Sequence, residues 1–374
     1  MFQHDRTVSA FAQVRNREDL ARLGTATGIF RRMSDASDHL VPVSEFAAAR
    51  ERLVGRVVRT PLLTSSTAAR WVQAASGVRL ADDTLYLKAE HLQTTGSFKA
   101  RGTTNRIATL SPEAHARGAI TMSAGNAGQA YAYAGRASGV AVTVVMPAGA
   151  VASKVAACRG YGARVILHGD HVGEGFAELE RIRDAEGLTL VHPFDDPMVI
   201  AGNGTVGSEI LEDLPDVDVV VVGIGGGGLI SGVAAAIREA RPSVRVYGVE
   251  PATSDAMSQA MTAGEIVTIQ PRSVADGLGA PFAGVWTLAM ARHYLEGIVL
   301  LDDATILAGL RFAIERMKQV VEPAGAAAVA AVLAGRIPIR AGERVAVVLS
   351  GGNVAVDQLG ELIAAAGALP GSGL

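Results

Sequence analysis

The stretch Gly96-Ser97-Phe98-Lys99-Ala100-Arg101-Gly102 places a lysine in a glycine-bounded turn beside an aromatic ring, shortly after the strand-like run Leu85–Ala89. A second glycine-rich element, Gly225-Gly226-Gly227-Gly228, directly follows the apolar run Val219–Val222. The polar turn Ser123-Ala124-Gly125-Asn126 lies between the two in sequence. Together these elements offer an amine nucleophile, a backbone cup for a phosphate and a hydrogen-bond donor.

Short apolar runs recur along the chain, separated by alanine-rich stretches such as Gly128–Ala137 and Gly325–Leu333. Continuous apolar strands that alternate with helices are typical of parallel sheets covered on both faces. We therefore expect an α/β protein with two open parallel-sheet domains, whose ligand lies where loops leave the carboxyl ends of the strands. The expected strands are Leu85–Leu87, Ala119–Met122, Ala141–Val145, Arg164–Leu167, Leu188–Val191, Val217–Val222, Val244–Val249 and Val345–Leu349.

Length and composition exclude several classes of protein. A chain of 374 residues is long enough for two compact domains. A net charge of −3 and an aromatic content of 5% give neither the basic field nor the stacking platforms expected of a nucleic-acid partner. Val219–Ile237 carries no charge, but its four consecutive glycines would break a membrane helix. The single Cys158 and the lack of a secretory signal indicate the cytoplasm.

Seven motifs, taken in order, carry a resemblance that runs from about Val41 to about Leu359. The chain resembles the fold-type II pyridoxal-phosphate enzymes of the threonine dehydratase and serine racemase family. The motifs are Lys88-Ala89-Glu90 with Gln93 and GSFKARG at 96–102, SAGN at 123–126, HPFDDP at 192–197, GGGGL at 225–229, VADG at 274–277, VEPAG at 321–325 and SGGN at 350–353.

The resemblance implies the tryptophan synthase β-like architecture, in which a small domain is inserted into a larger cofactor-binding domain. Residues 118–195 would form the small domain, and residues 41–117 together with 196–374 the large one. Residues 1–40 precede the matching region and are expected to be a mobile extension. The family also implies a homodimer.

Lys99 is the residue that the resemblance assigns to the covalent bond with pyridoxal 5'-phosphate and to removal of the substrate Cα proton. A free lysine has a pKa of about 10.4, so burial or a nearby cation must lower this value before the amine can attack an aldehyde. Phe98 would pack near the cofactor ring. The alternative for Lys99 is an ordinary surface lysine.

The loop Gly225–Gly228, with Leu229 at the start of the next helix, presents backbone N–H groups that suit a phosphate dianion. An alternative remains open here. Gly223, Gly225 and Gly228 also satisfy the dinucleotide fingerprint, and Glu250 lies 22 residues beyond Gly228, where an acid would contact a ribose. A nicotinamide-dependent oxidoreductase would leave GSFK and SGGN without a role.

The remaining site residues follow from the resemblance. Asn126 would donate to the phenolic oxygen of the cofactor, and Ser123, Gly125 and Asn126 would bind the substrate carboxylate. Ser350 would face the pyridine nitrogen, where a hydroxyl makes the ring a weaker electron sink than a carboxylate does, which suits β-elimination. Asp276 is a further candidate for substrate binding, and it and Glu322 either line the pocket or are structural acids.

Three positions bear on the reaction and the substrate. Racemising relatives resemble one another in having serine where this chain has Ala124, and alanine cannot donate a proton, so dehydration is favoured. Ala127 replaces the usual histidine and Asn203 the usual glutamine, which leaves other β-hydroxy amino acids open. The acids Glu209, Asp213, Asp216 and Asp218 are interpreted as a solvated loop, and no metal is expected.

The sequence thus predicts a pyridoxal-phosphate-dependent ammonia-lyase that converts L-threonine or L-serine to a 2-oxo acid and ammonia. The alternatives are a dehydratase of another β-hydroxy amino acid such as 3-hydroxyaspartate, a serine racemase-like enzyme, and the nicotinamide-dependent oxidoreductase. The chain ends 21 residues after Asn353, so no regulatory domain and no feedback by isoleucine are expected.

Overall fold

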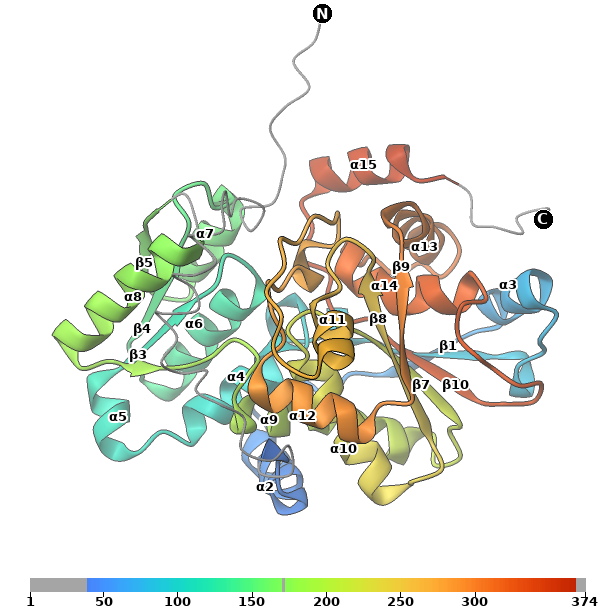
Figure 1. Cartoon of the computed structure of the whole chain (residues 1–374), viewed down its shortest axis with the longest axis horizontal. Helices are drawn as coiled ribbons and strands as arrows, with labels where there is room; N and C mark the ends of the chain where they lie inside the picture. The colour runs from blue at the N-terminus through green and yellow to red at the C-terminus, as the bar shows by residue number, and fades with distance from the viewer. Residues whose placement is uncertain (1–38, 170–171, 368–374) are drawn as a thin grey trace, which may run out of the picture.

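Two β-sheets organise the computed structural model, which describes residues 39–169 and 172–367 (Figure 1). The larger sheet has six strands in the order β1-β2-β10-β7-β8-β9, and the smaller has four in the order β5-β4-β3-β6. All neighbouring strands are parallel except β1 and β2. The strands are β1 (Leu62–Ser65), β2 (Leu85–Lys88), β3 (Ala119–Met122), β4 (Val142–Met146), β5 (Arg164–Leu167), β6 (Thr189–Leu190), β7 (Val219–Gly223), β8 (Arg245–Pro251), β9 (Gly297–Leu301) and β10 (Val345–Val348).

Helices cover both faces of the larger sheet, which is why its central strands are continuously apolar. In β7, Val219 and Val221 pack against one layer of helices, while Val220 and Val222 pack against the other. The first layer is formed by α3 (Ser66–Ser76), α13 (Asp303–Glu315) and α14 (Pro323–Leu333). The second is formed by α2 (Val43–Leu53), α9 (Pro197–Asp213), α10 (Gly228–Ala240), α11 (Ala256–Ala263) and α12 (Val285–Tyr294).

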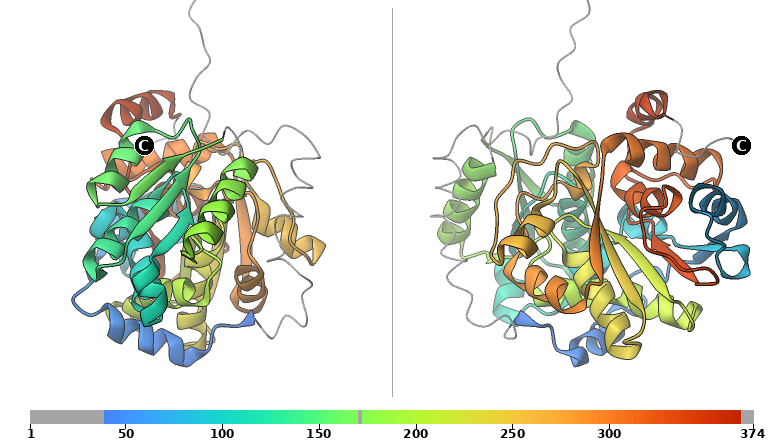
Figure 2. Two further views of the ribbon diagram at one scale, coloured as in Figure 1. Left: turned by 90° about the vertical axis from the view of Figure 1, so that its left-hand side faces the viewer. Right: turned by 45° about the vertical axis from the view of Figure 1, so that its right-hand side comes forward.

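The smaller sheet is also covered by helices on both faces (Figure 2), and its strands fall between residues 119 and 190. Helices α6 (Asn126–Ser138) and α7 (Ala152–Gly160) pack on one face, and α8 (Val172–Glu186) packs on the other. The two halves meet where α4 (Lys99–Ala108) packs against both α6 and α9. The remaining described helices are α5 (Pro112–Arg117), α15 (Val356–Ala365) and the short 3₁₀ helices η3 (Ala81–Asp83), η4 (Glu90–Leu92), η5 (Thr94–Gly96) and η6 (Asp276–Leu278).

The predicted α/β class with two parallel sheets is confirmed, with two additions. The strands β1 and β9 are absent from the sequence prediction, and β1 makes the larger sheet antiparallel at one edge. Both are edge strands whose residues are mostly only partly buried. Only Leu62 and Leu63 are apolar in β1, whereas β9, Gly-Ile-Val-Leu-Leu, has an apolar run that the sequence analysis overlooked. The predicted mobile extension concerns residues 1–40, of which 1–38 lie outside the described ranges. Among the described helices, none combines the length and hydropathy needed to cross a bilayer.

Candidate active site

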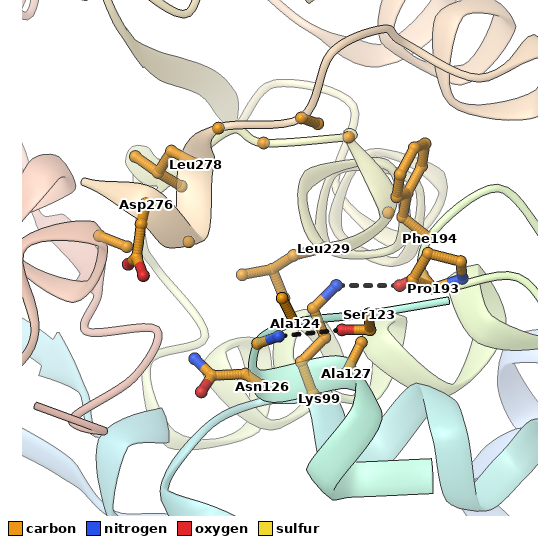
Figure 3. A pocket seen from close by; sticks show the side chains of 18 of the residues that line it. Lys99, Ser123, Ala124, Asn126, Ala127, Pro193, Phe194, Leu229, Asp276 and Leu278 are labelled. Atoms are coloured by element: carbon orange, nitrogen blue, oxygen red, sulfur yellow. Dashed lines mark hydrogen bonds between the residues drawn. The ribbon is translucent and has the colours of Figure 1, made fainter. Parts of the chain in front are cut away.

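A pocket lies at the carboxyl ends of the strands, between the two sheets (Figure 3). Its walls come from the segments that follow β2, β3, β4, β5, β6, β7 and β10, together with residues 276–282 and 322–324. Every residue predicted for the site lines this one pocket, although the segments are far apart in sequence. These residues are Phe98, Lys99, Ser123, Gly125, Asn126, Gly225, Gly226, Gly227, Gly228, Leu229, Asp276 and Ser350.

Lys99 opens α4, and its turn is anchored to the chain that follows β10. The N–H of Phe98 donates to the carbonyl of Ser350 (3.1 Å), and Ser97 forms a bridge with Gly351. Lys99 Nζ then reaches into the pocket and donates to the carbonyl of Pro193 (2.9 Å). Burial lowers the pKa of this amine from its usual 10.5 to about 8. The surface-lysine alternative is therefore wrong, because the amine is desolvated inside a pocket.

His192 lies beside this amine and was not singled out from the sequence. Its Nδ1 accepts hydrogen bonds from the N–H groups of Phe194 (3.3 Å) and Asp195 (2.8 Å). Burial, followed by the positive charge of Lys99, lowers the pKa of the imidazole to about 3. His192 is therefore neutral at physiological pH. The only sequence indication was its place in the motif HPFDDP.

The glycine loop offers backbone donors and has no room for side chains. Among the described residues, no hydrogen-bond acceptor faces the N–H groups of residues 225–229, which line the pocket at the start of α10. A Cβ on Gly226 would lie 2.4 Å from the Phe194 ring, and one on Gly228 would lie 2.7 Å from the Phe194 carbonyl oxygen. Gly227 has a φ of +89°, which favours glycine on its own account. The cup therefore requires glycine for packing against Phe194 as well as for the approach of an anion.

The turn after β3 is fixed by side chains from the other half of the molecule. The N–H of Gly125 donates to Ser123 Oγ (3.2 Å; Figure 3), which closes the turn. Asn126 Nδ2 donates to Glu322 Oε1 (2.7 Å), and Asn126 Oδ1 accepts from Asn353 Nδ2 (2.9 Å). These two bonds determine which way the Asn126 amide points. Sequence analysis missed the role of Asn353, although it belongs to the motif SGGN.

Three ionisable groups, Glu322, Asp276 and Lys154, line the pocket. Burial, reinforced by the charge of Asp276, raises the pKa of Glu322 to about 8. Asp276 Oδ2 in turn pairs with Lys154 Nζ at 2.5 Å. The sequence left the place of Asp276 and Glu322 open, and both line the pocket. Lys154 was missed, because its partner lies 122 residues away.

Ser350 follows β10, and its hydroxyl donates to the carbonyl of Ala324 over a long 3.4 Å. Ala124 and Ala127 also line the pocket, so the replacements noted in the sequence bear directly on it. Asn203 does not line it. Its amide oxygen accepts from the N–H of Gly102 (3.1 Å) and its Nδ2 donates to the carbonyl of Gly228 (3.1 Å), so it joins α4, α9 and α10.

Glu209 corrects the sequence interpretation of a solvated acidic loop. It lies in α9 and accepts from Arg101 Nη1 (2.7 Å) and from Lys88 Nζ (2.6 Å). Arg101 also binds Glu90 (2.8 Å), and the side chains of Lys88, Glu90 and Arg101 are fully buried. We call these four residues the buried ion quartet, and through Arg101 they include the first turn of α4. Groups of His, Cys, Asp and Glu suited to a metal ion are absent among the described residues.

Comparison with known proteins identifies the family. The family described as "Pyridoxal-phosphate dependent enzyme" matches residues 55–351. The chain belongs to this family. It is 40% identical to an L-threonine ammonia-lyase of Thermotoga maritima over 325 residues, which cover 87% of this chain and 78% of that protein.

Solved structures agree with this assignment. Maize serine racemase superposes with a TM-score of 0.80 and 33% identity, covering 86% of this chain and 96% of that chain. The processed form of threonine deaminase isoform 2 from Solanum lycopersicum superposes with a TM-score of 0.78 and 30% identity, covering 88% of this chain and 95% of that chain.

The residues of this pocket fit pyridoxal phosphate. The cup at residues 225–229 offers backbone N–H groups without acceptors, at the positive end of α10, to a phosphate. Lys99 offers an amine whose pKa is low enough for attack on an aldehyde. The dinucleotide alternative lacks its acid, because Glu250 is buried and accepts from the N–H groups of Met257 and Ser258 (2.9 Å each).

Proposed function

We propose that this protein is an L-threonine or L-serine ammonia-lyase, which eliminates water from the substrate and gives a 2-oxo acid and ammonia. One observation carries the proposal. A desolvated amine, a phosphate cup and the turn at residues 123–126 face one another in a single pocket. The similarity to a protein named L-threonine ammonia-lyase supports threonine as substrate.

Pyridoxal phosphate, when bound, supplies an aldehyde for a lysine and a ring that withdraws electrons from the substrate Cα. We assign the covalent bond to Lys99 and the phosphate to the N–H groups of residues 225–229. Phe98 packs beside the Lys99 amine, with Nζ 5.1 Å from the ring centroid. We assign Asn126 to the phenolic oxygen and Ser350 to the ring nitrogen. The Asn126 amide is held for this task by Glu322 and Asn353.

The protein side of the reaction follows from proton positions. With a pKa of about 8, a substantial fraction of the Lys99 amine is neutral at physiological pH, and neutral amine can accept the Cα proton. Ser123, Gly125 and Asn126 bind the substrate carboxylate through the start of α6. The side chains of Ala124 and Ala127 carry no exchangeable proton, so neither position supplies an acid that could return a proton to Cα. Elimination is therefore favoured over racemisation.

The test uses the purified holoenzyme with L-threonine, L-serine and 3-hydroxyaspartate, with release of 2-oxo acid as the readout. We expect turnover of L-threonine or L-serine, and its loss in Lys99→Ala. Borohydride reduction followed by peptide mass spectrometry should place the cofactor on Lys99. A cofactor-saturated protein that releases no 2-oxo acid from L-threonine or L-serine would refute the proposal, and release from 3-hydroxyaspartate alone would favour the alternative substrate.

Domain limits, assembly and compartment are part of the same proposal. We assign residues 118–195 to an inserted small domain, on the strength of the smaller sheet at 119–190. We also propose a cytoplasmic homodimer. Buried Cys158, whose pKa burial raises to about 11, is suited to a reducing compartment and is not a reactive thiol. Sedimentation velocity and cell fractionation test these points.

A further inference from the structure

One ion pair joins the two halves of the molecule across the pocket. Lys154 lies in α7, which packs on the smaller sheet. Asp276 lies in η6, in the half of the molecule that is built on the larger sheet. Lys154 Nζ and Asp276 Oδ2 are 2.5 Å apart. The two side chains are 26% and 36% exposed, so the pair stands where the pocket meets solvent. Figure 3 shows Asp276 on the wall opposite Pro193 and Phe194, with Lys99 between them.

This pair governs the charge that an entering substrate meets. Among the described residues that line the pocket, Lys154 and Lys99 are the only lysines or arginines, and His192 is neutral. Lys99 is reserved for the cofactor in the proposed function. Lys154 is therefore the cation left for a substrate side chain, and Asp276 already occupies it. Glu322 lies close enough for both charges to act on it, since Asp276 raises its pKa and Lys154 lowers it.

The pair also lies on the side where the substrate carboxylate is expected. Glu322, which both charges affect, accepts directly from the amide of Asn126 (2.7 Å). An amino acid held by the turn at residues 123–126 would extend its side chain within the space that Asp276 and Lys154 border. A second carboxylate there would have to take Lys154 from Asp276. That exchange leaves Asp276 unpaired in a partly buried site.

We infer that Asp276 is a specificity-determining residue, which holds the ammonium of Lys154 and thereby excludes amino acids that carry a second carboxylate. This inference rests on the proposed function and narrows it to β-hydroxy amino acids with uncharged side chains. The hydroxyl and methyl groups of threonine need no cation, so they leave the pair intact. 3-Hydroxyaspartate is rejected for the charge of its side chain.

Three variants separate charge from loosening of the pocket. Asp276→Asn frees Lys154, Lys154→Gln frees Asp276, and the double variant removes both charges, while all three break the same ion pair. Isothermal titration of the holoenzyme gives the affinities for L-aspartate and L-2-aminobutyrate, which lack a β-leaving group. We expect Asp276→Asn to raise the preference for L-aspartate about tenfold, the factor that one charge-assisted hydrogen bond supplies. Lys154→Gln should lower it, and the double variant should lie between.

The inference is overturned if the wild type binds L-aspartate as tightly as L-2-aminobutyrate, or if all three variants shift the preference alike. The second result would make the pair a simple closure of the pocket. Failure of the proposed function has a different signature. Affinities that shift as expected, in a protein that releases no 2-oxo acid from L-threonine or L-serine, would refute the lyase while supporting the role of Asp276. Turnover with unchanged preferences would refute the role of Asp276 alone.

Discussion

Replacing Glu209 by Gln should destabilise the protein strongly, because it leaves an unbalanced cation in the interior. The buried ion quartet contains two cations, Lys88 and Arg101, and two carboxylates, Glu90 and Glu209. Glu209 accepts three short bonds, two from Arg101 (2.7 and 2.8 Å) and one from Lys88 (2.6 Å). Burial alone would raise the pKa of Glu209, but its bonds to Arg101 and Lys88 outweigh burial and lower it. The carboxylate is therefore charged at neutral pH, and the quartet is neutral as a whole.

Glutamine keeps the shape of Glu209 but removes its charge and turns an N–H₂ group toward donors. Breaking one partner of a buried ion pair costs about 3–5 kcal/mol, and we expect a loss in that range. Urea denaturation of the cofactor-free protein at neutral pH, followed by circular dichroism, measures it. The matched control is Glu315→Gln, whose pair with Arg311 is about half exposed and should cost less than about 1 kcal/mol.

A second substitution sharpens this test. Adding Lys88→Met to Glu209→Gln removes one of the two cations and leaves the pair of Arg101 with Glu90, so part of the lost stability should return. A Glu209→Gln protein as stable as the Glu315→Gln control would refute the view that these charges depend on one another.

Three further predictions follow from the pocket. Burial lowers the pKa of Lys99 to about 8. In the cofactor-free protein, the rate at which an aldehyde and borohydride trap this amine should therefore reach half its maximum near that pH. A pH profile centred near 10.5 would contradict the burial of the amine. The pKa of Glu322 is raised from 4.5 to about 8 by burial and by Asp276, so the folded protein retains a proton that the unfolded chain releases between those values. The stability that Glu322 contributes therefore falls as pH rises through this window, and Glu322→Gln should flatten the pH dependence of the urea midpoint; an unchanged slope would argue against it. Ala124→Ser supplies a hydroxyl in the pocket and should raise the ratio of racemisation to elimination with L-serine, which chiral chromatography measures. The control is Ala127→Ser, which also lines the pocket. Equal ratios in the two variants would count against a specific role of position 124.

Much of the fold was predictable because its features repeat over short distances. The strands at the centres of the sheets are mostly apolar, and β7 is followed by a glycine turn and an alanine-rich helix, at Val219–Ala240. The strand β1 escaped prediction because only two of its four residues are apolar, whereas the apolar run of β9 was overlooked. For Gly226 the sequence predicted one reason for glycine, the approach of a phosphate to the backbone. The second reason, contact with the Phe194 ring, is visible only in the tertiary structure.

The residue types and their order determined the α/β class and the alanine at position 124, and they predicted that Lys99 and the glycine loop at residues 225–228 would belong to one site, which they line together. Only the tertiary structure decided which charges neutralise one another. Arg101 meets Glu209 across 108 residues and Lys154 meets Asp276 across 122, and no local pattern indicates either pairing. The physical reason is that backbone periodicity depends on neighbours a few residues apart, whereas the partner of a desolvated charge depends on how the strands are ordered and the helices packed.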